Sequence, residues 1–165
     1  MAILAGAPTK KLPTALENFK GVKRRFSYKI KTQKRVLIDD YAHHPTEIDA
    51  LFQAVTELYP NEKKLIVFQP HLYSRTQDFV AGFARSLSQF DEVLLLDIYP
   101  AREKPRKGIT SSWLLEKIKT KKKLITKTQI AASLLDSKTR IQLLVGAGDI
   151  GEEVATVTKI IQDNE

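Results

Sequence analysis

The chain has 165 residues, of which 42% are hydrophobic and 28% are charged, and it carries a formal net charge of +8. This balance is typical of a globular domain with its own core, and it excludes a chain that is disordered along its whole length. There is no cysteine, which excludes disulfides and thiolate zinc sites. The apolar runs are too short to cross a bilayer, so we expect a cytoplasmic protein with no membrane partner.

Helices and strands alternate after an opening segment that carries little pattern. Residues 1–20 predict only a short helix over 13–19. The stretches GVKRRFSYKI and QKRVLIDDY predict two strands joined by a polar turn, and the spacing of apolar residues predicts a helix over 45–59. The remaining predicted elements are, in order, a strand over 63–69, a helix over 74–90, a strand over 91–99, a helix over 110–120, a short strand over 122–126, a helix over 128–137, a strand over 140–146 and a helix over 149–162.

Strands that alternate with helices predict βαβ units, in which the strands run parallel and helices cover both faces of the sheet. We therefore predict an α/β fold, a Rossmann-like three-layer sandwich with a mostly parallel sheet. The two opening strands add an antiparallel edge near the N-terminus. Ligands of such folds bind outside the carboxyl ends of the strands, so the turns that follow the strands are where chemistry is expected.

Polar side chains collect in the turns that follow the predicted strands. All three histidines lie in the first two of these turns, His43 and His44 in one and His71 in the other. Together with Asp39 and Asp40 they could bind zinc or manganese, but their spacing matches no metal motif. We therefore predict polar turns without a metal ion.

Arg75 stands at the predicted start of a helix, directly after the second of these turns. A guanidinium in that position can form a two-point pair with a carboxylate or a phosphate. A salt bridge with Asp78 is the alternative. His71 and Tyr73 share the turn with Arg75, which favours an anionic ligand.

The stretch GAGDIG, residues 146–151, has the spacing of a dinucleotide-binding fingerprint. Only 14 residues follow Gly151, and they are predicted to be helical, so the next strand of such a unit has no place. We expect these glycines to permit a tight turn and close helix packing, while an anion at this helix N-terminus stays open. No Walker-type phosphate loop occurs, so the chain is not expected to hold a triphosphate by itself.

The positive charge is compatible with nucleic acid or with an anionic small substrate. The densest basic run, KIKTKKK over 117–123, is expected to form a solvated surface turn at a helix end. No aromatic residue is interleaved with these lysines, which argues against a platform for stacking bases. We predict no nucleic-acid partner, and a basic RNA-binding α/β module remains an alternative.

Five stretches, taken together, resemble one family. FKGVKRRF, DDYAHHPTEI, FQPHLYSRT, DIYPAREKP and GAGDI occur in the order in which similar stretches occur in the C-terminal domain of the Mur ligases. The resemblance extends from about Phe19 to the end, and MAILAGAP is similar to the last helix of the family's central domain. It implies that residues 1–18 are the end of that helix and a linker, and that residues 19–165 are the C-terminal domain.

Within the family, the motifs are most similar to members that join L-alanine to UDP-N-acetylmuramate; a relative that joins a tripeptide to the same sugar is the alternative. The resemblance implies a bacterial cytoplasmic ligase of peptidoglycan precursor synthesis, which forms an amide through an acyl phosphate with ATP and Mg²⁺. A central domain would hold ATP and Mg²⁺, and an N-terminal domain would bind the UDP-sugar. Without these partner domains, the chain is expected to be inactive.

The same resemblance assigns roles to single residues. Arg24, or Arg25 by register, matches the arginine that reaches the ATP phosphates, and Asp40 matches an acid near the ribose. Tyr41 and His43 match residues at the junction of the nucleotide and the substrate.

The predicted L-alanine contacts are Tyr41, His71 and Arg75, and Arg75 is best suited to the carboxylate. The amine must lose a proton before it attacks, and an imidazole can accept that proton. His43 and His71 are the two candidates for this catalytic role, and the sequence leaves the choice open.

Overall fold

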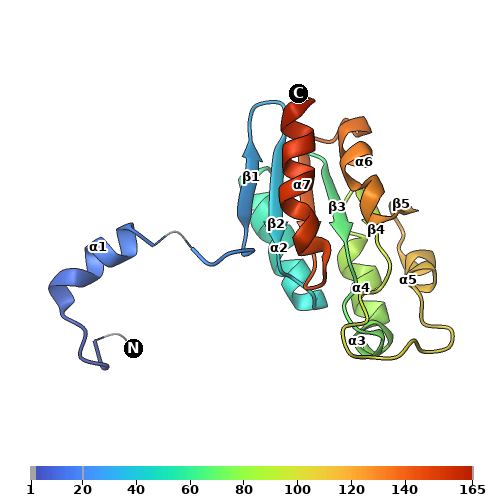
Figure 1. Cartoon of the computed structure of the whole chain (residues 1–165), viewed down its shortest axis with the longest axis horizontal. Helices are drawn as coiled ribbons and strands as arrows, with labels where there is room; N and C mark the ends of the chain where they lie inside the picture. The colour runs from blue at the N-terminus through green and yellow to red at the C-terminus, as the bar shows by residue number, and fades with distance from the viewer. Residues whose placement is uncertain (1–2, 20, 165) are drawn as a thin grey trace.

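The computed structural model describes residues 3–19 and 21–164 and shows a six-stranded sheet with helices on both faces (Figure 1). The strands are β1 (Ser27–Lys31), β2 (Val36–Asp40), β3 (Lys64–Phe68), β4 (Glu92–Leu95), β5 (Lys121–Leu124) and β6 (Ile141–Val145). The α-helices are α1 (Leu12–Glu17), α2 (Pro45–Leu58), α3 (Tyr73–Asp78), α4 (Val80–Leu87), α5 (Ser111–Lys117), α6 (Ile130–Asp136) and α7 (Ile150–Asp163), and two short 3-10 helices are η1 (Thr9–Lys11) and η2 (Lys127–Gln129).

The sheet has the strand order β1-β2-β6-β3-β4-β5. β1 runs antiparallel to β2, and all the other neighbours are parallel. The predicted α/β fold, with a mostly parallel sheet and an antiparallel edge near the N-terminus, is confirmed. β2, β3 and β6 are buried along their whole length, as expected for central strands that are covered on both faces.

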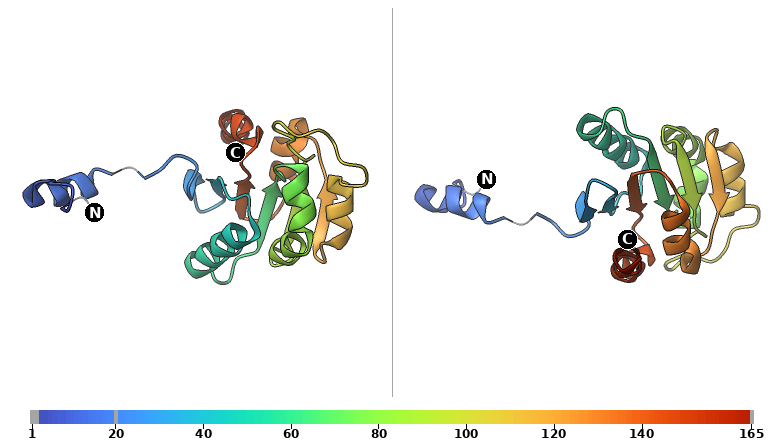
Figure 2. Two further views of the ribbon diagram at one scale, coloured as in Figure 1. Left: turned by 90° about the horizontal axis from the view of Figure 1, so that it is seen from below. Right: turned by 90° about the horizontal axis from the view of Figure 1, so that it is seen from above.

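The helices form the two outer layers of the sandwich (Figure 2). On one face α2, α4 and α5 pack together, and fully buried side chains such as Phe68 and Phe83 fill the space between them and the sheet. On the other face α6 and α7 cover a second cluster that includes Leu144 and Ile161. The sequence reaches this arrangement because α2, α4 and α7 each carry one buried apolar face with helical spacing.

The chain changes direction between β5 and β6, and the connecting helices change to the other face of the sheet there. Helices that follow β2, β3 and β4 lie on one face, whereas those that follow β5 and β6 lie on the other. Because β6 lies between β2 and β3, the segments that leave these three neighbours turn to opposite faces. Ligands of open α/β sheets bind at such a point.

The N-terminal segment stands apart from the sheet (Figure 1). The helix predicted over 13–19 corresponds to α1, which has no buried residue and whose Leu16 is 72% exposed. The stretch expected to end an earlier helix forms a turn over 3–6, and its residues 1 and 2 lie outside the described part of the chain. The predicted domain boundary stays a prediction.

The helix predicted over 74–90 differs from the structure, which contains two helices. α3 and α4 are separated at Phe79, whose backbone leaves the helical region with φ −112° and ψ 20°. The Phe79 ring packs on the imidazole of His44 with 4.5 Å between the ring centroids. This contact with a distant turn is not encoded in the apolar spacing of the helix itself.

The end of the lysine run lies on the protein surface as expected, but it forms a strand and not a turn, in line with the short strand predicted over 122–126. Lys121, Lys122 and Lys123 belong to the exposed edge strand β5, which pairs with β4. Exposed lysines on an edge strand discourage another chain from pairing with it. Among the described residues, no helix is long and apolar enough to span a membrane.

Candidate active site

The turns that follow β2, β3 and β4 meet at the carboxyl edge of the sheet. The imidazole rings of His43 and His71 lie 6.1 Å apart, and the His71 ring stacks on Tyr99 with 5.6 Å between centroids. The turn after β6 joins the same edge, because the backbone N–H of Gly146 donates to the carbonyl of Asp40 at 3.1 Å. Residues from four separate turns therefore share one surface.

Asp40 ends β2 and is 7% exposed. Its carboxylate accepts hydrogen bonds from the backbone N–H groups of Phe26, at 2.7 Å, and Ala42, at 2.8 Å. The carboxylate therefore ties the segment before β1 to the turn after β2. Its role near the ATP ribose stays a prediction.

The His43 ring is oriented by two oxygen atoms. Nδ1 lies 2.9 Å from the carbonyl oxygen of Tyr41 and 3.3 Å from Oε2 of Glu47. Both oxygens accept, so Nδ1 carries the proton and Nε2 of the neutral ring keeps its lone pair. Burial raises the pKa of Glu47, but the N–H groups of His43 and His44 and the nearby positive charges outweigh it, and the pKa lies below its ordinary value.

His71 has the opposite tautomer. Nη1 of Arg75 lies 3.3 Å from Nδ1 of His71, and a guanidinium only donates, so Nδ1 accepts and the ring proton is on Nε2. Burial, the charge of Arg75 and the nearby His43 lower the pKa of His71. The structure thus brings together both predicted histidines but places them in different hydrogen-bonding states.

Arg75 is carried by α3, and Glu103 from the turn after β4 anchors that helix. The Glu103 carboxylate accepts from the backbone N–H of Ser74 at 2.9 Å and from the Ser74 hydroxyl, and these hydrogen bonds lower the pKa of Glu103. In the described part of the chain no carboxylate lies within ion-pair distance of Arg75, so the alternative salt bridge with Asp78 is not formed. The guanidinium is available to an anionic ligand.

The two candidate ATP contacts, Arg24 and Arg25, have different surroundings. Arg24 donates from Nε to Oδ1 of Asp39 at 3.2 Å and from Nη2 to the carbonyl of Gly146 at 2.7 Å. Its guanidinium carbon lies 5.3 Å from the centre of the Tyr41 ring. The Arg25 side chain is 52% exposed. Arg24 is therefore fixed at the carboxyl edge by hydrogen bonds, whereas Arg25 reaches the same edge through a 4.0 Å ion pair with Glu47 and lies 5.9 Å from the centre of the Tyr41 ring.

The glycines of GAGDIG have the packing role that was expected of them. Gly146 has φ +148°, and a Cβ there would lie 2.8 Å from the carbonyl oxygen of Gln69. A Cβ on Gly148 would lie 2.7 Å from Cβ of Tyr99. The tight turn and the close approach of the helix are confirmed by these distances.

Gln69 and Asp149 link the end of β3 to the start of α7. Asp149 accepts from Nε2 of Gln69 and from Nζ of Lys127, each at 2.7 Å. Burial raises the pKa of Asp149, but these two hydrogen bonds outweigh it and lower the pKa. Sequence reasoning assigned no role to Gln69, Asp149 or Lys127. For Gln69, the available signal in the sequence was a glutamine at the end of a buried strand.

A family model described as "Mur ligase, glutamate ligase domain" matches residues 24–151 of the chain, which is more than half of its length. The chain belongs to the Mur ligase family. The resemblance of its five stretches to this family is confirmed.

Named relatives match the Mur ligase domain along nearly its whole length. The UDP-N-acetylmuramate–L-alanine ligase of Flavobacterium psychrophilum is 58% identical over 164 residues, which cover 99% of this chain and 37% of the relative. The ligase of the same name from Christiangramia forsetii is 59% identical over 162 residues, which cover 98% of this chain and 36% of the relative. The chain thus spans little more than a third of the length of these relatives.

Solved structures show the same fold. The UDP-N-acetylmuramate–alanine ligase of Thermotoga maritima superposes with a TM-score of 0.77 at 26% identity, and the match covers 99% of this chain and 36% of that one. A domain of a UDP-N-acetylmuramate:tripeptide-type ligase from Haemophilus ducreyi has a TM-score of 0.61 at 20% identity and covers 83% of this chain and 99% of that one. The second likeness concerns the fold alone.

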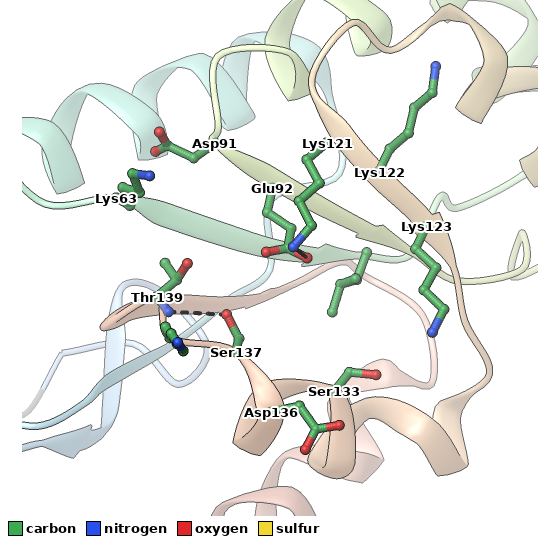
Figure 3. A pocket seen from close by; sticks show the side chains of 12 residues that line it. Lys63, Asp91, Glu92, Lys121, Lys122, Lys123, Ser133, Asp136, Ser137 and Thr139 are labelled. Carbon is green, nitrogen blue, oxygen red and sulfur yellow. Dashed lines mark hydrogen bonds and ion pairs between the residues drawn. The ribbon is translucent and has the colours of Figure 1, made fainter.

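The Mur ligase domain has cavities at both ends of its strands. One of about 250 Å³ lies beside the turns described above, between Tyr99, Lys127 and Asp149. Another of about 720 Å³ lies at the opposite, amino end, where Lys121 forms an ion pair with Glu92 at 2.9 Å (Figure 3). Neither cavity is lined by a residue of the predicted site. Among the described residues, no three His, Asp or Glu side chains lie close enough to hold a metal ion.

Proposed function

We propose that this chain is the C-terminal domain of a UDP-N-acetylmuramate–L-alanine ligase, with residues 1–18 as the end of the preceding domain and a linker, and residues 19–165 as the domain itself. ATP phosphorylates the muramate carboxylate, and L-alanine then displaces phosphate to form an amide. Two relatives with this name, 58% and 59% identical over nearly the whole chain, support the proposal. The rest of the enzyme supplies the UDP-sugar site and the ATP loop, and we assign the reaction to the bacterial cytoplasm.

The geometry around Arg75 carries the proposal. Its guanidinium has no carboxylate partner among the described residues, and it lies next to His71, whose ring is 6.1 Å from that of His43. An amino acid offers a carboxylate to the guanidinium and an ammonium group that must lose a proton. A two-point pair between Arg75 and the L-alanine carboxylate fixes the orientation of this substrate.

His43 is the better of the two candidate proton acceptors. Its Nε2 carries the lone pair, and a proton taken up there leaves the contacts of Nδ1–H with Tyr41 and Glu47 intact. Protonation of His71 would instead occur on Nδ1 and break the hydrogen bond from Arg75. We therefore assign proton transfer to His43 and the orientation of Arg75 to His71.

The bond changes balance in the following way. The alanine ammonium gives a proton to Nε2 of His43, and the free amine nitrogen forms a bond to the acyl carbon. The bond from that carbon to the phosphate oxygen breaks, phosphate leaves with the electron pair, and the second nitrogen proton passes to solvent. Arg24 contacts the ATP phosphates and Asp40 the ribose. Mg²⁺, when bound, would supply positive charge to the phosphates, and we assign its ligands to the preceding domains.

A chimeric ligase tests the proposal, in which this chain replaces the matching segment of the Flavobacterium psychrophilum relative. Phosphate release is followed with UDP-N-acetylmuramate, ATP, Mg²⁺ and L-alanine. Arg75→Ala is expected to lower kcat/KM for L-alanine by about 30- to 1,000-fold, because it removes a charged two-point pair that contributes about 2–4 kcal/mol. Arg85→Ala is the matched control, since the Arg85 side chain is 72% exposed on α4 and no change is expected.

Other outcomes reassign the domain. Phosphate release with a tripeptide but not with L-alanine would assign it to the tripeptide-joining relative. Equal activity of the Arg75→Ala chimera and its parent would move the alanine carboxylate away from this turn. Salt-dependent gel shifts with mixed RNA, without ligase activity, would favour the RNA-binding alternative.

A further inference from the structure

The guanidinium of Arg24 is fixed from several sides at the carboxyl edge. Asp39 binds Nε, the carbonyl of Gly146 binds Nη2, and the Tyr41 ring lies beside the guanidinium carbon. The backbone of Arg24 adds to this, because its carbonyl accepts from the N–H of Tyr41 at 2.8 Å. In the described part of the chain Nη1 has no hydrogen-bond partner, so this nitrogen of the guanidinium is available to a ligand.

Burial of the Asp39 carboxylate is energetically unfavourable. Its side chain is 1% exposed in the central strand β2, and burial raises its pKa despite the neighbouring charges of Arg24 and Lys29. Its second oxygen lies 3.7 Å from Nζ of Lys29. A buried charge of this kind is retained only where it is paired, and the pairing here is to a residue of the candidate ATP site.

Because Gly151 has no side chain, the guanidinium of Arg24 can lie directly beside its backbone. A Cβ on Gly151 would lie 2.4 Å from Nη1 and 2.6 Å from Cζ of Arg24, so a side chain there would force the guanidinium to shift. The cation therefore lies against the first turn of α7, where the helix dipole repels positive charge. The negative charge of Asp39 offsets that repulsion and keeps Arg24 in place.

We propose that Asp39 and Gly151 are positioning residues that hold Arg24 ready for the phosphates of ATP. Asp39 supplies the charge that fixes the guanidinium, and Gly151 supplies the gap in which it lies. The proposal rests on the function proposed above only in taking ATP as the ligand of Arg24. It adds two residues that do not themselves touch the substrate.

The test measures binding of a non-hydrolysable ATP analogue to the chimeric ligase by calorimetry, which needs no amino substrate. Asp39→Asn and Gly151→Ala are each expected to weaken binding on the order of ten- to a hundredfold, because a small displacement of a positioned group has effects of that size. KM for L-alanine is expected to stay unchanged. Gly82→Ala is the matched control, since its Cβ would press on Pro45 at 2.9 Å, away from Arg24.

The double variants decide between positioning and general damage. In an Arg24→Ala background, neither Asp39→Asn nor Gly151→Ala is expected to weaken binding further. Independent losses that multiply in the double variants would overturn the proposal, as would unchanged binding in both single variants. If the chimera fails to ligate L-alanine but the binding losses occur as expected, the proposed function fails and this inference stands. If Arg24→Ala binds ATP normally in a chimera that ligates L-alanine, this inference and the ATP contact of Arg24 fail, and the assignment of the domain to an L-alanine ligase stands.

Discussion

Replacement of Gln69 by alanine should destabilise the domain more than its position in a turn suggests. The side chain is 4% exposed and makes two hydrogen bonds across the carboxyl edge. Nε2 donates to Asp149 at 2.7 Å, and Oε1 accepts from the backbone N–H of Ile150 at 2.9 Å. Ile150 is fully buried, and truncation of Gln69 leaves its backbone N–H without a protein acceptor.

The magnitude follows from these two contacts. A buried N–H group left without an acceptor costs about 1–3 kcal/mol, and a hydrogen bond to a charged group contributes about 1.5–3 kcal/mol. We expect Gln69→Ala to lower the free energy of unfolding by about 3–5 kcal/mol. Gln53→Ala is the matched control, because Gln53 also donates to a carboxylate, Glu57 at 2.9 Å, but on the exposed face of α2. Its expected loss is below about 0.5 kcal/mol.

Gln69→Glu keeps the shape of the side chain and changes only one of its two hydrogen bonds, so it distinguishes their contributions. One carboxylate oxygen still accepts from Ile150, but the other faces the carboxylate of Asp149 where a donor stood at 2.7 Å. The pKa of the new carboxyl is therefore raised in the folded state. Its neutral form is compatible with the fold, so the deficit relative to wild type should be small at low pH and grow as pH rises through the raised folded pKa.

Urea unfolding followed by circular dichroism measures both variants at several pH values. A loss in the free energy of unfolding below about 1 kcal/mol in Gln69→Ala would mean that solvent satisfies the Ile150 N–H, and it would refute the magnitude expected above. A deficit in Gln69→Glu that does not change with pH would show that the two carboxylates are not close in solution.

Three further predictions concern the same edge. Gly146→Ala is expected to lower the free energy of unfolding by about 2 kcal/mol, because φ +148° and the carbonyl of Gln69 leave no room for Cβ; an unchanged urea midpoint would contradict this. Glu47→Gln should cost about 1 kcal/mol at pH 7 by losing a helix-capping carboxylate whose pKa is lowered, and this difference should vanish as pH falls through that lowered pKa. The His71 ring should titrate below its ordinary 6.5 in NMR spectra, and Arg75→Ala should raise its pKa; a fall would contradict the assigned contact.

The architecture was predictable because local and global signals agree in this chain. Continuous apolar runs marked strands buried on both faces, and alternation with helices implied parallel pairing. The insertion of β6 between β2 and β3 was not predictable, since any of several strand orders buries the same runs. The break at Phe79 was missed for a related reason, because it accompanies a ring contact with His44 across the fold.

The candidate site was predictable as a set of turns but not as a set of contacts. The rule that chemistry lies at the carboxyl ends of strands identified His43, His71 and Arg75 without any coordinates. It gave no indication that Asp39 would pair with Arg24, since that pair forms only because the segment before β1 folds back over the end of β2. The opposite tautomers of the two histidines likewise depend on neighbours that only the folded chain supplies.

Backbone strain gives independent support for locating function at this edge. Within residues 3–19 and 21–164 the non-glycine residues with positive φ are Arg24, Phe26, Leu72 and Ala101, with φ of 56°, 45°, 71° and 50°. All four lie in segments that enter β1 or leave β3 and β4, at the carboxyl edge, and none lies at the amino edge. Each left-handed residue costs about 1–2 kcal/mol, which the surrounding contacts must offset. Strain of this kind persists where a fixed geometry is useful, and it lies in the segments that carry Arg24 and the turn beside Arg75. The packing of the central strands thus offsets backbone strain at the edge where the proposed reaction needs fixed groups.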